Sequence, residues 1–237
     1  MRSSYHDTKA GRLSVELHGA GPPVFFWPSL FLDRSGGLVG IAVAAKYPEL
    51  IDRLAILGSP IAAPGRQERL QARVLLTLYR LFGGTERTIR TLLSQGIGSQ
   101  FRQARPGDFD VLVQRLIRVP YCGRLPAMRA VMLQRQDMLP RLAQLRIPVM
   151  LIRGEDDAFL TEEGFARQAA ALPAAIARVI MGSGPLPSLE KPEETTAALA
   201  DLFSGDRDAR EADTCLVRRR SWAADAIGST EFQAPSL

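Results

Sequence analysis

Histidine and cysteine are scarce in this sequence, and their scarcity excludes several kinds of chemistry. The 237 residues contain two histidines, His6 and His18, and two cysteines, Cys122 and Cys215. Ligands this few and this widely separated do not match a zinc site, so no metal is expected. Two cysteines at arbitrary spacing indicate reduced thiols in a cytoplasmic protein rather than a disulfide scaffold. A reaction that needs histidine could use only these two histidines.

Long apolar runs and phosphate-binding motifs are also missing. No stretch reaches the roughly 18 apolar residues that a membrane-spanning helix needs, so no such helix is expected. Residues 1–11 are polar and lack the apolar region of a signal peptide. The G-x-x-x-x-G-K-[ST] pattern of a nucleotide-binding loop is absent. Gly19-Ala20-Gly21 lacks the third glycine of a dinucleotide-binding motif and is expected to form a turn, so no cofactor is predicted.

Lysine is rare, and the positive charge of the chain comes from arginine. The formal net charge is +5, and lysine occurs at three positions. Residues 63–146 contain fifteen arginines and five acidic residues, so this segment alone carries +10. A basic surface could meet an anionic ligand, a membrane surface or nucleic acid, and the alternative is an ordinary solvated helix surface. No nucleic-acid-binding motif accompanies the arginines, so nucleic acid is not an expected partner.

The first part of the chain has the pattern of a parallel α/β unit. Hydrophobic residues make up 46% of the sequence, enough for a sizeable core. Residues 12–18 alternate between apolar and polar side chains, as in a half-buried strand, and 24–27 form a short buried strand. Residues 36–46 predict a buried helix and 54–58 a second buried strand. This order of strand, helix and strand is typical of a parallel sheet.

The middle and last parts of the chain follow different patterns. Residues 63–146 have the spacing of amphipathic helices and no strand signal. Two apolar series define these helices: Leu70, Val74, Leu78, Leu81 and Phe82, then Phe109, Leu112, Val113, Leu116 and Ile117. Strand and helix then alternate over the rest of the domain: a strand at 149–152, a helix capped by Thr161, a strand at 176–181 and a last helix from Pro192 to about Phe203. Residues 205–237 are charged and aperiodic and predict a disordered tail.

Four local sequences share a resemblance to one family. Residues 182–193, GSGPLPSLEKPE, resemble the loop G-x-G-H-x-P-x-x-E-x-P-E that carries the catalytic histidine of α/β-hydrolases. Residues 147–157 resemble the strand that carries the catalytic acid, with the signature G-x-x-D. Residues 36–54 resemble the helix after the nucleophile and the strand that follows it, and residues 21–28 resemble the strand before the oxyanion loop. The resemblance covers roughly residues 12–204.

The resemblance implies a fold and a domain division. We expect an α/β-hydrolase-like fold, with a reduced, mostly parallel sheet flanked by helices. Residues 1–62 and 147–204 would form the core, and residues 63–146 a helical lid. Eight residues separate Trp27 from Gly36, where the family would normally place about two further strand–helix units. We therefore predict that this block is missing.

The resemblance also implies two site residues, each with an alternative. Ser35 is the nearest match to the nucleophile of G-x-S-x-G, but the glycine before it is missing. Ser35 is either a remnant of that motif or a serine of the loop after the Trp27-Pro28 strand. Asp157 occupies the position of the acid that orients histidine in the family. Its alternative role is a turn or capping carboxylate, which Asp156 could also supply.

Pro185 stands where the family carries its catalytic histidine. Serine is a weak nucleophile until a base within hydrogen-bond reach takes its proton, and proline cannot act as that base. The resemblance thus implies a relative of serine hydrolases of small ester-like substrates whose catalysis is impaired or lost. The alternative is a non-catalytic protein that binds a small ligand or another protein, or a truncated gene product.

Overall fold

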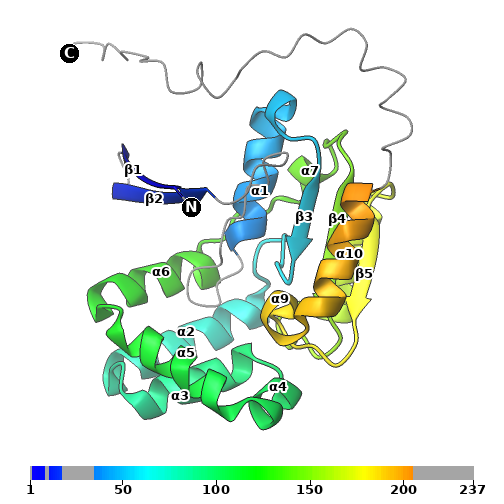
Figure 1. The fold of residues 1–237 in the computed structure, drawn as a ribbon. Coiled ribbons are helices and arrows are strands. Elements are labelled where there is room, and N and C mark those ends of the chain that lie inside the picture. Colours follow the sequence, from blue (N-terminus) through cyan, green and yellow to red (C-terminus); the bar gives the residue numbers. More distant parts are fainter. Residues whose placement is uncertain (1, 9–10, 18–34, 205–237) are drawn as a thin grey trace, which may run out of the picture.

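A computed structural model of the chain describes residues 2–8, 11–17 and 35–204. Its centre is a parallel sheet in the order β3-β4-β5, with strands Leu54–Leu57, Val149–Gly154 and Ile176–Ile180. Helices lie on both sides of this sheet, and a block of further helices extends beyond one of its ends (Figure 1). The strands predicted at 54–58, 149–152 and 176–181 are therefore confirmed, together with their parallel arrangement.

Alternate residues of β4 contact opposite layers of helices, as the pleat of a strand requires. Val149 and Leu151 pack with α1 (Ser35–Lys46), α7 (Leu139–Leu142) and α8 (Glu162–Ala171). Met150 and Ile152 pack on the other side, against α10 (Pro192–Ser204). Because both faces of the strand are buried, all four residues are apolar, which is why the sequence shows a continuous apolar run at this point.

Two glycines let α1 lie close to β3. A Cβ at position 37 would stand 2.7 Å from Ile56 Cγ2 and 2.7 Å from the Cβ of Ser59. A Cβ at position 40 would stand 2.9 Å from Leu54 Cδ1. The contacts at position 37 are shorter than side chains allow, so the packing of α1 on the strand requires glycine there, whereas the Leu54 methyl could shift to admit a Cβ at position 40. A 3-10 turn, η2 (Pro48–Leu50), joins α1 to β3.

The segment predicted to be entirely helical is helical, and no strand occurs in it. We call residues 63–146 the helical insert. Its helices before α7 are α2 (Arg66–Phe82), α3 (Glu86–Gly96), α4 (Ser99–Ala104), α5 (Pro106–Arg118) and α6 (Tyr121–Leu133). Helices α3, α4 and α5 share one apolar cluster, which contains the predicted series from Phe109 to Ile117. The predicted series on α2 is helical, but its five side chains are 46–72% exposed.

The N-terminal part differs from the prediction. Residues 2–8 were not expected to form a strand, yet β1 (Arg2–Thr8) pairs with β2 (Gly11–Leu17) in a separate antiparallel sheet. The strand predicted at 12–18 is thus present, but its partner is β1 and not the parallel sheet. Backbone groups of any residue can form such a ladder, so the polar composition of residues 2–8 concealed it. The predicted strand at 24–27 and the predicted tail at 205–237 lie outside the described residues.

The C-terminal elements follow the sequence signals closely. Thr161 caps α8, because its hydroxyl accepts a hydrogen bond from the backbone N–H of Gly164 at 3.2 Å. A short helix, α9 (Pro187–Glu190), precedes α10 and was not predicted.

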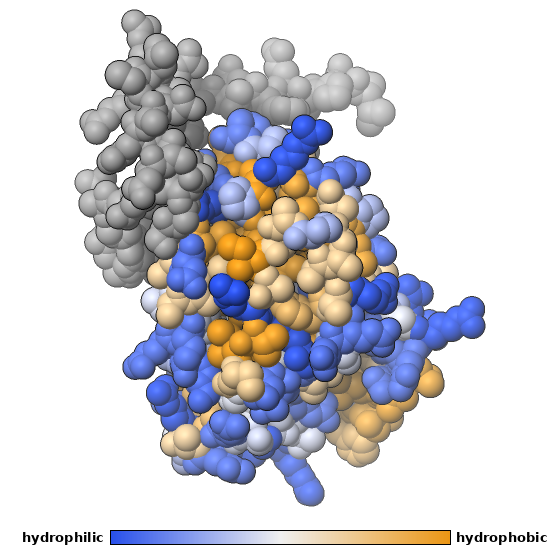
Figure 2. Space-filling model, turned by 90° about the vertical axis from the view of Figure 1, so that its right-hand side faces the viewer, coloured by the Kyte–Doolittle hydropathy of each residue, from blue (hydrophilic) through white to orange (hydrophobic). Residues whose placement is uncertain are grey.

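Strand β5 is an edge of the sheet and exposes Ile176 and Val179. Figure 2 views the molecule from this side and shows hydrophobic residues gathered between hydrophilic ones. None of the helices in the described ranges has the length and apolar character needed to cross a membrane.

The central strand offers a direct test of this core. Leu151 is 1% exposed in β4, whereas Leu50 in η2 is 70% exposed. We expect Leu151→Ala to lower the free energy of unfolding by about 2–5 kcal/mol, because it leaves a cavity between packed layers. The matched change Leu50→Ala should stay within about 0.5 kcal/mol of the parent. Urea unfolding of the three proteins measures both effects, and equal losses for the two variants would contradict the layer arrangement.

Candidate functional site

Three loops meet at the carboxyl end of the parallel sheet. Gly58 follows β3, Asp157 follows β4 and Pro185 follows β5. Gly58 has a positive φ of 54°, and a Cβ there would overlap the carbonyl oxygen of Pro185 and lie 3.7 Å from Asp157 Oδ2. The two residues that the motifs align with the family's acid and histidine, Asp157 and Pro185, therefore both lie next to Gly58. In open parallel sheets, ligands bind outside this end of the strands.

A close backbone contact holds the Pro185 loop against β4. Gly154 is the last residue of β4, and a Cβ there would overlap the carbonyl oxygen of Gly184. The N–H of Asp156 donates to the carbonyl of Ser183 at 2.8 Å, and the N–H of Gly182 donates to the Glu155 carboxylate at 2.8 Å. The overlap at Gly154 explains why glycine ends the strand.

The buried carboxylate of Glu190 organises the loop further. It accepts hydrogen bonds from the backbone N–H groups of Gly184 at 2.7 Å, Leu186 at 3.1 Å and Gly98 at 3.1 Å. Gly98 lies immediately before α4 in the helical insert. Glu190 therefore joins the loop at the sheet end to the insert. The bonds to Gly184 and Leu186 make no use of an N–H at position 185, which proline lacks.

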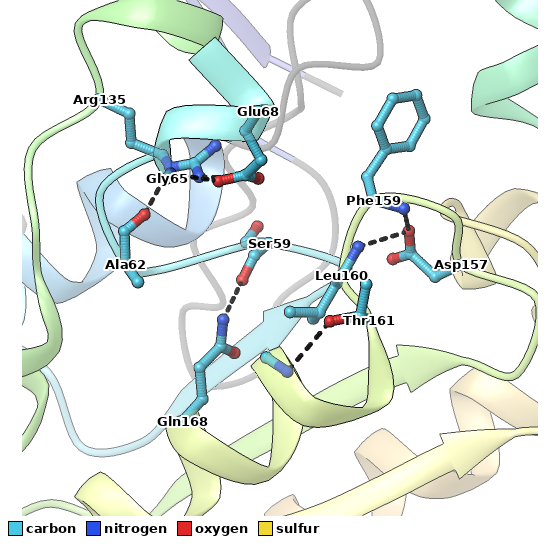
Figure 3. A network of polar contacts seen from close by, with 11 residues as sticks. Ser59, Ala62, Gly65, Glu68, Arg135, Asp157, Phe159, Leu160, Thr161 and Gln168 are labelled. Atoms are coloured by element: carbon cyan, nitrogen blue, oxygen red, sulfur yellow. Dashed lines mark hydrogen bonds and ion pairs between the residues drawn. The ribbon is translucent and has the colours of Figure 1, made fainter. Parts of the chain in front are cut away.

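Asp157 has the hydrogen bonds of a turn carboxylate. Its Oδ1 accepts from the backbone N–H groups of Phe159 at 2.8 Å and Leu160 at 3.0 Å (Figure 3). The residue is buried. Asp157 therefore has the alternative role that the sequence analysis gave it, that of a turn carboxylate. The turn that it stabilises directly precedes Thr161, the N-cap of α8. A role as catalytic acid stays a prediction.

Ser35 is the first residue of α1. The first turn of this helix lies near the same end of the sheet, because Gly37 is packed against Ser59, the residue after Gly58. The backbone of the predicted nucleophile segment and the loops of Asp157 and Pro185 thus adjoin the residues that follow β3. The role of Ser35 itself remains a prediction.

A buried glutamine fixes the loop after β3 and was not singled out from the sequence. Gln168 of α8 donates from Nε2 to the carbonyl oxygen of Ser59 at 3.2 Å (Figure 3). The Ser59 hydroxyl donates to the carbonyl of Leu57 at 3.1 Å. A glutamine in the middle of an amphipathic helix gives no sequence signal of its own. Glu190 did carry a signal, since it occupies the glutamate position of the family's loop motif.

A cavity of about 930 Å³ lies between the helical insert and this end of the sheet. Helices α2, α3 and α6 supply most of its wall, and that wall is largely apolar. Asp156, Ala158, Phe159 and Pro185 line it from the sheet side. Its volume falls within the roughly 300–1,000 Å³ that small-molecule sites usually have. The candidate site is therefore a cavity that the Asp157 and Pro185 loops enter from one side.

Three arginines and two acids contribute charge to this cavity: Arg102, Arg124 and Arg135, with Glu68 and Asp156. Arg135 donates to the carbonyl of Ala62 at 2.8 Å and lies 3.6 Å from Glu68 (Figure 3). Burial lowers the pKa of Arg135, while Glu68 opposes that shift. Within the described part of the chain, no three histidine, cysteine, aspartate or glutamate side chains gather as a metal site would require.

Comparisons with known proteins identify the fold. No family model matches the sequence, and no curated protein matches it. Among solved structures, a thermophilic esterase from Thermogutta terrifontis is similar, with a TM-score of 0.61, 23% identity, and coverage of 71% of this chain and 61% of the esterase. An enol-lactonase from Burkholderia xenovorans LB400 has a TM-score of 0.60 at 17% identity, covering 71% of this chain and 62% of the lactonase.

A third structure agrees with these two. The 2-hydroxy-6-oxo-6-phenylhexa-2,4-dienoate hydrolase from Rhodococcus sp. strain RHA1 has a TM-score of 0.57 at 20% identity, covering 72% of this chain and 62% of the hydrolase. The chain therefore has the α/β-hydrolase fold, with a reduced parallel sheet, as its motifs predicted. It spans about three fifths of the length of these structural neighbours.

Glu190 provides the test of how the site is assembled. We expect Glu190→Gln to lower the free energy of unfolding by about 1–3 kcal/mol, because the amide replaces one of two oxygens that accept three buried N–H groups. Glu49 is exposed in η2, so Glu49→Gln is the matched control and should have little effect. Hydrogen exchange of the Gly98 and Gly184 amides should accelerate in Glu190→Gln alone. Unchanged protection of both amides would refute the role assigned to Glu190.

Proposed function

We propose that this protein uses the α/β-hydrolase fold to bind a small ester-like molecule in the cavity, with ester hydrolysis absent or very slow. The observation that carries the proposal is Pro185. Its loop lies beside Gly58 and Asp157 at the carboxyl end of the sheet, where the family's loop motif has histidine. The helical insert would act as the lid over the bound molecule.

Hydrolysis by a serine requires a general base. A serine hydroxyl at position 35 needs a base to take its proton, and the proline side chain has no group that accepts one. Asp157 accepts hydrogen bonds from two backbone N–H groups of its own turn through Oδ1, which holds its carboxylate in that turn. His6 lies in the separate β1–β2 sheet, and His18 is outside the described residues. Neither histidine occupies a position that the family uses for catalysis.

The local structure accommodates proline without cost to the loop. Gly184 and Leu186, on either side of Pro185, both donate to Glu190, and the loop is also held by Gly182 and Ser183. Proline at position 185 removes none of these bonds. The site framework can therefore persist without the catalytic histidine, which suits a binding protein that retains the fold of an enzyme.

The class of ligand is suggested by the structural neighbours. Their names describe an esterase, an enol-lactonase and a hydrolase of a dienoate. At identities of 17–23%, these likenesses concern the fold, so esters and lactones enter here as the class of molecule to be tested first. A cytoplasmic location, expected from the cysteines, is part of the same proposal.

A second candidate is a hydrolase with altered chemistry. It is favoured by one observation: the backbone at the start of α1 and the buried Asp157 both adjoin the residues after β3. In such an enzyme Ser35 would remain the nucleophile, and a group other than histidine would be its base. Kinetics of the variants below separate the two candidates.

Ester turnover tests the main proposal. We expect the parent protein to hydrolyse p-nitrophenyl acetate and p-nitrophenyl butyrate at rates close to the uncatalysed reaction. Ser35→Ala should not change these rates, because the hydroxyl is not activated. Ser188 is exposed in α9 and provides the matched control, Ser188→Ala. A high parent rate that disappears in Ser35→Ala and persists in Ser188→Ala would establish the hydrolase instead.

Replacement of the proline tests what else is missing. We expect Pro185→His to fold like the parent, since the loop is held by Glu190 and by backbone contacts. Histidine alone should not restore turnover, because the sequence before Ser35 lacks the strand and glycine that position the family's nucleophile. The measurement is ester turnover together with thermal melting. A gain of about a hundredfold or more that depends on Ser35 would show that the loss of histidine is the whole defect.

A further inference from the structure

Arg124 is a buried arginine that lines the cavity without a hydrogen-bond acceptor for two of its nitrogens. It belongs to α6 and is 6% exposed. Its Nε and Nη1 are buried, and neither has a hydrogen-bond partner among the described residues. A guanidinium carries five N–H donors and stays charged at any ordinary pH. Burial of such a group without a partner is strongly unfavourable, so its presence needs an explanation.

The contacts around Arg124 place its guanidinium but do not neutralise it. The Cζ atom lies 5.9 Å from the centroid of the Tyr79 ring, within the range of a cation–π contact. Burial raises the pKa of Tyr79, with a smaller opposing effect of Arg124, so the phenol is neutral near pH 7. On another side is Gly84, where a Cβ would stand 2.5 Å from Nη2. The glycine thus leaves room for the guanidinium and contributes no side-chain acceptor.

Three other charged groups of the cavity, Glu68, Arg135 and Arg102, have partners among the described residues. Glu68 accepts from the backbone N–H of Gly65 at 2.8 Å and lies 3.6 Å from Arg135. Arg102 donates from Nε to the carbonyl of Ile97 at 3.2 Å. Asp156 lies on the sheet side of the cavity, in the loop after β4. Arg124 is therefore the cavity-lining arginine whose buried donors lack an acceptor in the described structure.

The shape of the guanidinium indicates what would pair with it. Its N–H groups form a planar fork that matches the two oxygens of a carboxylate, and such charge-assisted pairs are among the strongest hydrogen bonds. Apolar residues of α2 and α6 line the same cavity, Leu75, Leu78, Met128 and Met132 among them. A ligand that satisfies both surroundings has one carboxylate and an apolar body.

We propose that the cavity binds an apolar carboxylic acid, or an ester or lactone that carries a free carboxylate, with that carboxylate on Arg124. The proposal rests on the proposed function, because it names the class of small molecule that the same cavity takes. The apolar body would extend along α2 and α6. Arg124 is thus a binding residue, separate from Ser35, Asp157 and Pro185.

Calorimetric titration with paired probes tests the proposal. The probes are octanoate, decanoate and 4-phenylbutanoate, each compared with its uncharged primary amide. We expect at least one acid to bind the parent protein at least tenfold more tightly than its amide. Arg124→Gln should weaken the acid about tenfold or more and leave the amide within about threefold. Arg129 is an exposed arginine of the same helix, so Arg129→Gln is the matched control and should leave both affinities unchanged.

A second readout separates a binding role from a structural one. If Arg124 is present for a ligand, the protein without ligand bears the cost of its unpaired donors, and an apolar replacement of similar length removes that cost. Arg124→Met should therefore melt at the same temperature as the parent or higher. A clear fall in melting temperature would show that Arg124 serves packing, and it would overturn the proposal.

The outcomes also distinguish this proposal from the proposed function. Equal binding of acid and amide, with no effect of Arg124→Gln, would overturn the carboxylate proposal and leave small-molecule binding intact. Failure of all six probes to bind would count against both. Ester turnover that depends on Ser35 would overturn the absence of hydrolysis, while the affinity pattern of the acids would still decide the role of Arg124.

Discussion

The carboxylate of Glu190 is the interaction on which the arrangement of the candidate site depends. Its two oxygens accept from backbone N–H groups of the loop after β5 and from the N–H of Gly98 in the helical insert. One buried charge is thereby compensated by three donors, as a buried carboxylate requires. The loop and the insert are joined through this side chain, and the cavity lies between the two parts that it connects. The geometry of the cavity wall near Pro185 follows from that connection.

The same loop shows how a fold can retain its framework while a catalytic position changes. The glycines around Pro185 allow close approach of the loop to Gly154 and Gly98, and none of these contacts involves the side chain at position 185. Hydrogen bonding of the loop is thus independent of the residue that does chemistry in the α/β-hydrolase family. Asp157 illustrates the same separation, because its two hydrogen bonds to Phe159 and Leu160 hold a turn whether or not a histidine is present. The hydrogen bonds described here would therefore hold this loop with or without a histidine at position 185.

The helical insert combines apolar exposure with positive charge. Helix α2 buries Ala72, Leu76 and Tyr79 but leaves the predicted apolar series exposed, and several members of that series line the cavity. The amphipathic pattern predicted that these α2 side chains pack in the core. Several of them instead face the cavity, where they could contact a bound molecule. The arginines that give the insert its charge of +10 have different surroundings. Arg124 is buried at the cavity, whereas Arg90 is exposed and forms ion pairs with Glu86 and Asp110. Charge alone could not distinguish them.

By itself, the sequence determined the elements of the core and the motif positions. The apolar runs at 54–58, 149–152 and 176–181 report burial on both faces of a strand, and small residues at 36–46 report a helix packed closely on one, because these are local consequences of burial. The G-x-x-D signature and the loop motif likewise marked Asp157 and Pro185. Tertiary structure decided the rest: the pairing of β1 with β2, the bond between Glu190 and Gly98 across 92 residues, and the burial of Arg124 beside a cavity. These features depend on contacts between segments that are far apart in the sequence. The local spacing of residues does not specify such contacts.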